Sequence, residues 1–148
     1  MVAIRRILAP VDFSSCSRES LTFAARLAHQ CGAELHVLYV EPAFLEAVAH
    51  GQHVDLLGEA RTALAEFAAE AVPAGQAATV QHVEAGPADG TICAAADRIQ
   101  ADLIVMGPRG RSPLAATLLG STTRGVLQHA PCPVAVVPAA RKPAFNGS

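Results

Sequence analysis

The stretch Leu103-Ile104-Val105-Met106-Gly107-Pro108-Arg109-Gly110 sets the fold class of this chain. Four apolar residues in a row, stopped by a glycine, are typical of a short strand that is buried on both faces of a parallel sheet. Gly107 and Gly110 can adopt backbone angles closed to other residues and let another group approach the main chain. The stretch therefore predicts a parallel strand that ends in a loop suited to a ligand.

Four more segments on either side of this stretch have the apolar or β-branched character of strands. Pro10 is expected to stop the first of them, and Pro131 and Pro133 precede the last. The predicted strands are Ile4 to Ala9, Glu34 to Val40, Thr79 to Val83, Leu103 to Met106 and Val134 to Val137.

Helical patterns fill the intervals between the predicted strands. Apolar residues recur at helical spacing from Ser20 to Ala28, with serines at 14 to 17 suited to cap the start and Gly32 placed to cap the end. The other predicted helices are Leu57 to Val72, Pro87 to about Ile99 and Ser121 to His129. Alternating strands and helices predict an α/β fold, a three-layer domain whose open, five-stranded parallel sheet has helices on both faces.

Composition places the chain among folded proteins without a general attraction for polyanions. Its 148 residues are 51% hydrophobic and 16% charged, which fits one densely packed domain over residues 1–148, with a loose tail from Ala139 to Ser148. A formal net charge of -2 gives no overall attraction to nucleic acid or anionic membranes. With no apolar run near the roughly 20 residues of a membrane span, we expect a cytoplasmic protein with no membrane or nucleic-acid partner.

Neither the histidines nor the cysteines are spaced like a metal site. His50 and His53 lie in a polar stretch without nearby acids or thiols, and the four cysteines are scattered along the chain. We therefore expect no metal site formed by the protein alone and predict that the thiols are reduced.

A candidate ligand site follows from the predicted sheet. In open α/β sheets, ligands bind beyond the carboxyl ends of the strands, where the loops of two neighbouring strands diverge. Asp12 follows the first strand, and Arg109 lies in the glycine loop after the fourth. Gly120-Ser121-Thr122 places backbone N–H groups and two hydroxyls at a helix start, which suits an anion.

The charged residues of these loops have simpler explanations as well. Asp12 is equally of the type that caps a loop before a helix. Arg109 and Arg111 are equally compatible with ordinary solvated surface charges. The pattern is not a P-loop, because no lysine lies between Gly107 and Thr123.

Three ordered motifs resemble the universal stress protein family over nearly the whole chain. The spacing Gly107-x2-Gly110-x9-Gly120-Ser121 is similar to the nucleotide-binding pattern of that family. Residues 7–14, ILAPVDFS, and residues 126–134, VLQHAPCPV, extend the likeness to both ends. The chain departs from the pattern most visibly at Pro108, a position that often carries a polar residue.

The resemblance implies an ATP site, with Mg2+ accompanying the nucleotide, and it implies a role for each site residue. Pro10, Val11, Asp12 and Val37 would line the adenine and ribose end, and Met106 and Gly107 would cover the ribose. The residues implied to hold the phosphates are Arg109, Gly110, Gly120, Ser121, Thr122 and Thr123.

The resemblance also implies an assembly and a strand order. The order would be 3-2-1-4-5, and Val134 to Val137 would pair with the same strand of a second copy to give a homodimer. The protein partner such a dimer would serve is not indicated by the sequence.

The leading hypothesis for function is an ATP-binding universal stress protein that acts as a nucleotide-responsive regulatory or stress-protective module. No nucleophile with an assigned base and orienting group is found, so we expect no dedicated catalysis and at most slow ATP hydrolysis. Two alternatives stay open: an ATP-hydrolysing α/β enzyme, and an interaction module of the same fold that has lost its nucleotide.

Overall fold

The computed structural model describes residues 3–42, 48–51, 55–76, 78–110 and 118–138. His53, Arg111 and the tail from Ala139 lie outside these ranges. The elements along the chain are β1 (Arg6–Val11), α1 (Ser15–Cys31), β2 (Glu34–Glu41), α3 (Leu56–Ala71), β3 (Thr79–Ala85), α4 (Ala88–Arg98), β4 (Leu103–Met106), α5 (Ser121–His129) and β5 (Val134–Val136).

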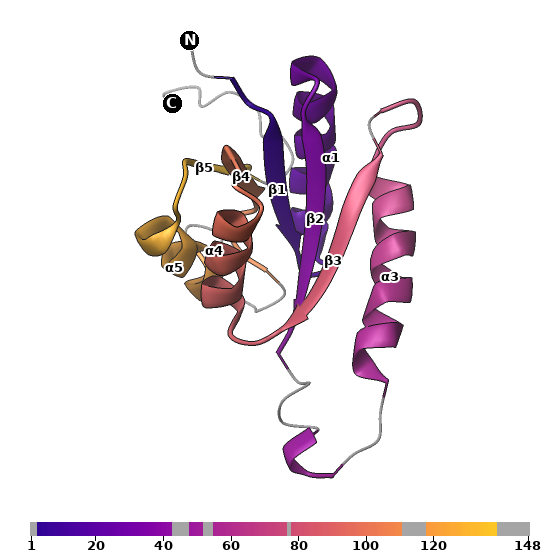
Figure 1. The fold of residues 1–148 in the computed structure, drawn as a ribbon, viewed down its shortest axis with the longest axis vertical. Helices are drawn as coiled ribbons and strands as arrows, with labels where there is room; N and C mark the ends of the chain where they lie inside the picture. The colour runs from indigo at the N-terminus through magenta and orange to yellow at the C-terminus, as the bar shows by residue number, and fades with distance from the viewer. Residues whose placement is uncertain (1–2, 43–47, 52–54, 77, 111–117, 139–148) are drawn as a thin grey trace, which may run out of the picture.

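All strands join one parallel sheet in the order β3-β2-β1-β4-β5, as predicted (Figure 1). β1 is central: Ile7 is paired with Leu35 of β2 on one side and with Leu103 of β4 on the other. The winding therefore reverses at β1, because β2 and β3 lie to one side of it while β4 and β5 lie to the other. The predicted α/β architecture is confirmed.

The sheet separates two hydrophobic cores, because successive side chains of a strand point to opposite faces. On one face α1 and α3 pack through Leu21, Leu64 and Phe67 against residues that include Leu35 and Val37. On the other face α4 and α5 pack through residues such as Ile92 and Val126 against Leu8 and Leu38. Figure 1 shows the two helix pairs on opposite sides of the sheet.

The first strand runs past Pro10, so the expectation that Pro10 stops it is wrong. Strand N–H and C=O groups point alternately to the two neighbouring strands. The Arg6 carbonyl accepts a hydrogen bond from the Asp102 N–H, just before β4 (2.8 Å). Pro10 lies two turns of this alternation after Arg6, so its backbone groups also point toward β4. The pairing of β1 with β4 ends at Leu8, before Pro10 is reached. A missing N–H at that position removes no bond of the sheet.

Both ends of α1 have the caps that the sequence predicts. The Ser14 Oγ accepts a hydrogen bond from the Ser17 N–H (3.1 Å), which satisfies one of the free amides of the first turn. Gly32 ends the helix with a φ of 64°, in the left-handed region that favours glycine. These caps fix where the chain leaves β1 and where it enters β2.

The connection from α5 to β5 is short and contains two prolines. The Ala130 N–H still donates to the Val126 carbonyl (2.8 Å), and the Pro133 carbonyl already accepts from the Ile104 N–H of β4 (3.0 Å). The chain between them includes Pro131, whose φ is fixed by its ring. Among the described helices, none combines the length and the apolar character needed to cross a membrane.

Removing the cap of α1 should destabilise the protein. We expect Ser14→Ala to lower the free energy of unfolding by about 1 kcal/mol, because the Ser17 N–H loses its acceptor. Urea denaturation followed by circular dichroism measures the change. Ser15→Ala is the matched control, since Ser15 is the exposed first residue of the helix and should cost little. Equal losses in the two variants would contradict this role of Ser14.

Candidate nucleotide-binding site

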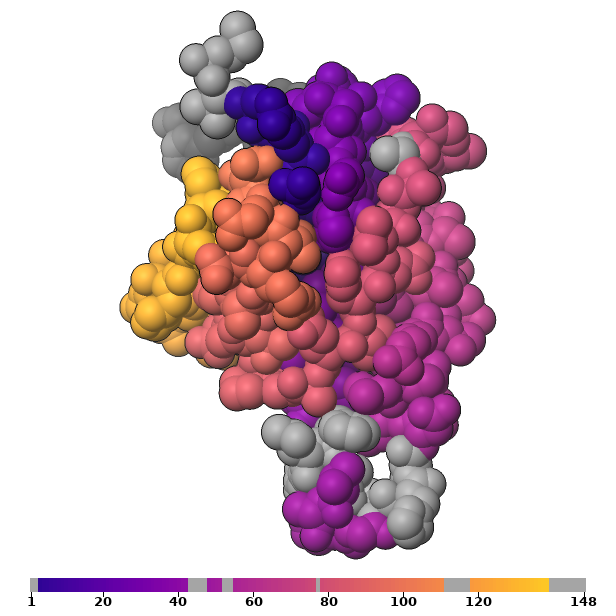
Figure 2. Space-filling view, viewed as in Figure 1, coloured from indigo at the N-terminus to yellow at the C-terminus, as the bar shows by residue number. Residues whose placement is uncertain are grey.

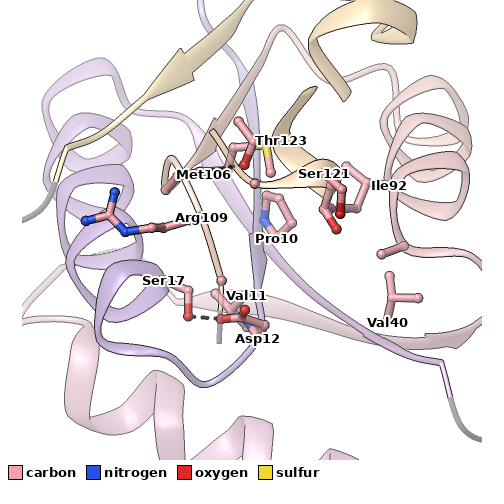
Figure 3. Close-up of a pocket in the computed structure, with 15 residues that line it drawn as sticks. Pro10, Val11, Asp12, Ser17, Val40, Ile92, Met106, Arg109, Ser121 and Thr123 are labelled. Carbon is pink, nitrogen blue, oxygen red and sulfur yellow. Dashed lines mark hydrogen bonds between the residues drawn. The ribbon is translucent and has the colours of Figure 1, made fainter. Parts of the chain in front are cut away.

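A cavity of about 250 Å3 opens at the carboxyl edge of the sheet, between the ends of β1 and β4 (Figure 3). The starts of α4 and α5 close its other side. The residues that line it are Pro10, Val11, Asp12, Ser17, Val40, Ala88, Ile92, Met106, Gly107, Arg109, Gly110, Gly120, Ser121, Thr122 and Thr123. The loops after β1 and β4 thus meet at the point where the winding of the sheet reverses, which is where such folds bind ligands.

The cavity brings together all of the predicted site residues except Val37. Val37 is fully buried, pairs with Ala9 and belongs to the core under α1 and α3. Its side chain therefore lies on the wrong face of β2 to reach the cavity. Val40, three residues along the strand, points to the α4 face and lines the cavity instead. The prediction for Val37 is corrected on this ground.

Ser17, Val40, Ala88 and Ile92 also line the cavity and were not predicted as site residues. The alternation of β2 was a usable signal for Val40, because even-numbered residues of that strand face α4. Ala88 and Ile92 gave no such signal, because they join the site only through the packing of α4 against the sheet.

The glycine loop is clamped to the start of α5 by two hydrogen bonds. The Thr123 hydroxyl, in a side chain that is 2% exposed, donates to the Gly107 carbonyl (2.9 Å). The Gly120 N–H donates to the Pro108 carbonyl (2.7 Å), so this amide is already used inside the protein. The first helical turn supplies further N–H donors, beside the lining residues Arg109 and Gly110 of the loop.

The first turn of α5 has no side-chain cap, because its N-cap is Gly120. The amides of Ser121, Thr122 and Thr123 lie at this start, and the positive end of the helix dipole reinforces them. Ser121 and Thr122 add hydroxyls at the cavity wall. Such an arrangement suits an anion such as a phosphate group.

Two glycines keep the loop close to its neighbours. A Cβ on Gly107 would lie 3.2 Å from the Cys16 Cβ and 3.3 Å from the Cys16 carbonyl oxygen. A Cβ on Gly110 would collide with Asp12 Oδ2. Gly107 therefore packs closely against the first turn of α1, and at Gly110 the end of the Asp12 side chain occupies the space that a Cβ would take.

Asp12 orders the turn before α1 and also lines the cavity. Its Oδ1 accepts a hydrogen bond from the Ser14 N–H (3.0 Å), which orders the turn before α1. Its carboxylate also lines the cavity beside Gly110. The Ser17 hydroxyl accepts from the Asp12 N–H (3.3 Å; Figure 3), so the whole turn is held by side chains.

Both apolar and polar side chains line the cavity. Val40 and Ile92 form the apolar wall together with Met106, and Figure 3 shows the Arg109 guanidinium directed away from Pro10 and Ser121. Of the side chains that line the cavity, Asp12 and Arg109 are the charged ones. Within the described ranges, no three histidine, cysteine or carboxylate side chains gather closely enough to hold a metal ion.

Comparison with known proteins agrees with this architecture. The model of the universal stress protein family matches residues 3–138. A universal stress protein of Synechocystis sp. is 36% identical over 142 residues, which cover 93% of this chain and 88% of the relative.

Solved structures share the fold. Universal stress protein UspA from Lactobacillus plantarum superposes with a TM-score of 0.72 and is 28% identical, covering 93% of this chain and 99% of its own. The universal stress protein of Archaeoglobus fulgidus, solved in complex with dAMP, has a TM-score of 0.65 and is 24% identical, covering 92% and 98%. By its family match and its relatives, this chain belongs to the universal stress protein family.

Proposed function

We propose that this protein binds an adenine nucleotide, with ATP as the leading candidate, in the cavity between β1 and β4. The observation that carries the proposal is the combination, in one cavity, of an apolar wall and the uncapped start of α5. A nucleotide has the matching division into a flat, weakly polar base and a charged phosphate chain. Nucleotide occupancy would then act as a regulatory or stress-protective signal.

The base end would be formed by the apolar wall. Val40, Ile92 and Met106 are held in the core between the sheet and α4, so their positions are fixed before a ligand arrives. Pro10 and Val11 at the end of β1 complete this side. Preformed apolar walls with a few polar groups are typical of small-molecule sites.

The phosphate end would be formed by the start of α5 and the glycine loop. A helix terminus contributes only about 0.3 to 2 kcal/mol, whereas micromolar affinity needs about 8 kcal/mol. Several donors must therefore act together, including the amides of Ser121 to Thr123 and either Arg109 or Arg111. The dAMP complex of the fold relative from Archaeoglobus fulgidus is consistent with this proposal.

Mg2+ would be held chiefly by the nucleotide. Asp12 is the one carboxylate among the lining residues, and its Oδ1 already accepts from the Ser14 N–H. Mg2+ commonly keeps several waters and binds substrate phosphates together with one or two carboxylates. The residues present fit that mode, with Asp12 as a single ligand or as a partner of a bound water.

Binding rather than catalysis is the proposed activity. Of the described residues that line the cavity, Asp12 has the one side chain suited to act as a general base, and its Oδ1 already accepts from the Ser14 N–H. Release of ADP or AMP at steady turnover would instead favour the enzyme alternative. Pro108 favours the nucleotide-free alternative, because it removes one amide from the loop; a folded protein that fails to bind ATP would support that reading.

Filling the space at Gly110 should abolish binding. We expect Gly110→Val to weaken ATP binding at least tenfold, because the new side chain displaces Asp12 and narrows the phosphate path. Calorimetric titration of nucleotide-free protein with Mg-ATP measures the affinity. Gly90→Ala is the matched control, since a Cβ at this exposed position of α4 meets nothing within 4 Å. Equal affinities in the two folded variants would argue against this site.

Breaking the clamp between α5 and the glycine loop should weaken binding by a smaller factor. Thr123→Val keeps the shape of the side chain but leaves the Gly107 carbonyl without its donor. At about 1 kcal/mol for a hydrogen bond, we expect roughly fivefold weaker binding together with a loss of stability.

Thr22→Val separates the two effects of that substitution. The Thr22 hydroxyl donates to the Ala71 carbonyl (2.6 Å) between α1 and α3, and neither residue lines the cavity. This variant should lose stability while its ATP affinity stays unchanged. An equal loss of affinity in both variants would show that Thr123 acts only through general stability.

We further propose a homodimer formed through β5, which is an edge strand of the sheet. The Pro133 carbonyl and the Val137 N–H bond to β4 (3.0 and 2.8 Å). By alternation the backbone groups of Val134 and Val136 face the open edge, where a second copy can pair with them.

A proline at the open edge should therefore yield a monomer. Val136→Pro removes an N–H that faces away from β4, so the sheet of each subunit keeps its own bonds. Sedimentation velocity should show a dimer for the unchanged protein and for Val136→Thr, which keeps the N–H, and a monomer for Val136→Pro. A dimer in all three would place the interface elsewhere.

A further inference from the structure

Two histidines and a glutamate form a hydrogen-bonded row outside the cavity, on the first halves of β2 and β3. His36 Nδ1 lies 2.9 Å from His82 Nε2, and His36 Nε2 lies 3.0 Å from Glu34 Oε1. We propose that Glu34, His36 and His82 form a proton-sensitive link between β2 and β3. The hydrogen bond between the two histidines is kept while the row holds at most one added proton, and it is lost when the row takes up a second. The proposal is independent of the nucleotide site.

The sheet register brings the two rings together. His36 pairs with Val80 and His82 pairs with Leu38, so the two histidines are diagonal neighbours on the same face. Their planes are 15° from parallel with centroids 5.2 Å apart, yet the two nitrogens are only 2.9 Å apart. The rings therefore meet at their edges, nitrogen to nitrogen, and one proton must lie between them.

The number of protons in the row decides whether the bond exists. Neutral imidazole carries one N–H and one acceptor nitrogen. Glu34 accepts from His36 Nε2–H, which leaves the His36 Nδ1 lone pair to accept from His82 Nε2–H. A first added proton on the His36 ring, beside the Glu34 carboxylate, still leaves one hydrogen between the rings, because His36 then donates from both nitrogens and His82 Nε2 accepts. A second would put hydrogens on both facing nitrogens, so the bond is lost and two cations oppose each other.

The surroundings resist protonation of His82, the ring that would take the second proton. The charged groups that face the row are Glu34 on β2, Glu84 on β3, Arg98 on α4 and Arg6 on β1, whose guanidinium lies 3.6 Å from Glu34. Burial, and then the charges of His36 and Arg98, lower the pKa of His82, and Glu84 opposes this shift. The hydrogen bond from His36 lowers the pKa of Glu34, which keeps it an acceptor.

The row occupies a part of the sheet where a proton can arrive from solvent. His36 is buried at 7% exposure, but Val80 beside it is 45% exposed and the Glu34 side chain is 59% exposed. Figure 2 shows β2, in purple, reaching the surface between the indigo start of β1 and the pink β3. β3 is the edge strand, so loss of the bond removes a side-chain link at the border of the sheet.

The direction of the pH effect follows from the lowered pKa of His82. A histidine that resists protonation in the folded state takes up its proton more readily when unfolded, so the unfolded chain binds more protons. This stabilising contribution is complete above the ordinary histidine pKa of about 6.5 and is lost as the pH falls through the lower folded value. Mild acid should therefore loosen β3 first.

Nuclear magnetic resonance of the ring nitrogens tests this proton-sensitive link. We expect the pair of rings to take up its two protons in two steps separated by at least about one pH unit, as strongly interacting groups do. A downfield N–H signal between the rings should be present at pH 8 and lost after the second step. Hydrogen exchange of the β3 amides should accelerate over the same step.

Two variants and a control make the outcome decisive. His82→Gln can still donate to His36 but cannot take up a proton, so the second step of proton uptake and the matching step in β3 amide exchange should disappear. Glu34→Gln, at an exposed position, should lower the pH midpoint of the first step. His29→Gln, which removes an exposed histidine of α1, should leave both steps in place. Uptake of both protons at a single midpoint, an exchange step that persists in His82→Gln, or a first step unchanged in Glu34→Gln would overturn the proposal.

Discussion

The pairing of β1 with both β2 and β4 is the constraint on which the rest of the structure depends. Because the winding reverses at β1, the loop that follows it and the loop that follows β4 leave the sheet toward opposite helix layers. The space between them is filled by no strand and no crossover, so a cavity results from the topology itself. The glycines at 107 and 110 then determine how narrow that cavity is.

Much of this arrangement could be predicted from the sequence, because the signals were local. Apolar runs gave the strands, Ser14 and Gly32 gave the ends of α1, and the spacing of the glycines gave the loops. Val37 could not be placed correctly by a run of apolar residues alone, because both faces of β2 are buried and the run does not say which face meets the ligand. The effect of Pro10 was misjudged because the sequence did not show that β1 is no longer paired with β4 at this position.

The helix starts of this protein divide into two kinds. The start of α1 is closed by the Ser14 side chain, whereas α5 begins at a glycine and α4 at Pro87, neither of which provides a side-chain cap. α1 thereby gains stability from its own sequence. Both of these starts border the cavity, where no side chain caps their first-turn amides. The first turns of α4 and α5 thus lack the stabilisation that a side-chain cap gives to α1.

A short, proline-containing connection joins α5 closely to β5. The glycine loop is bonded to one end of α5, and the other end reaches the edge strand with little slack in the chain. The connection has little spare length to absorb a shift of α5 relative to β5. The mouth of the cavity and the edge of the sheet are therefore linked through α5 and this short connection, and a shift of the helix would act on both.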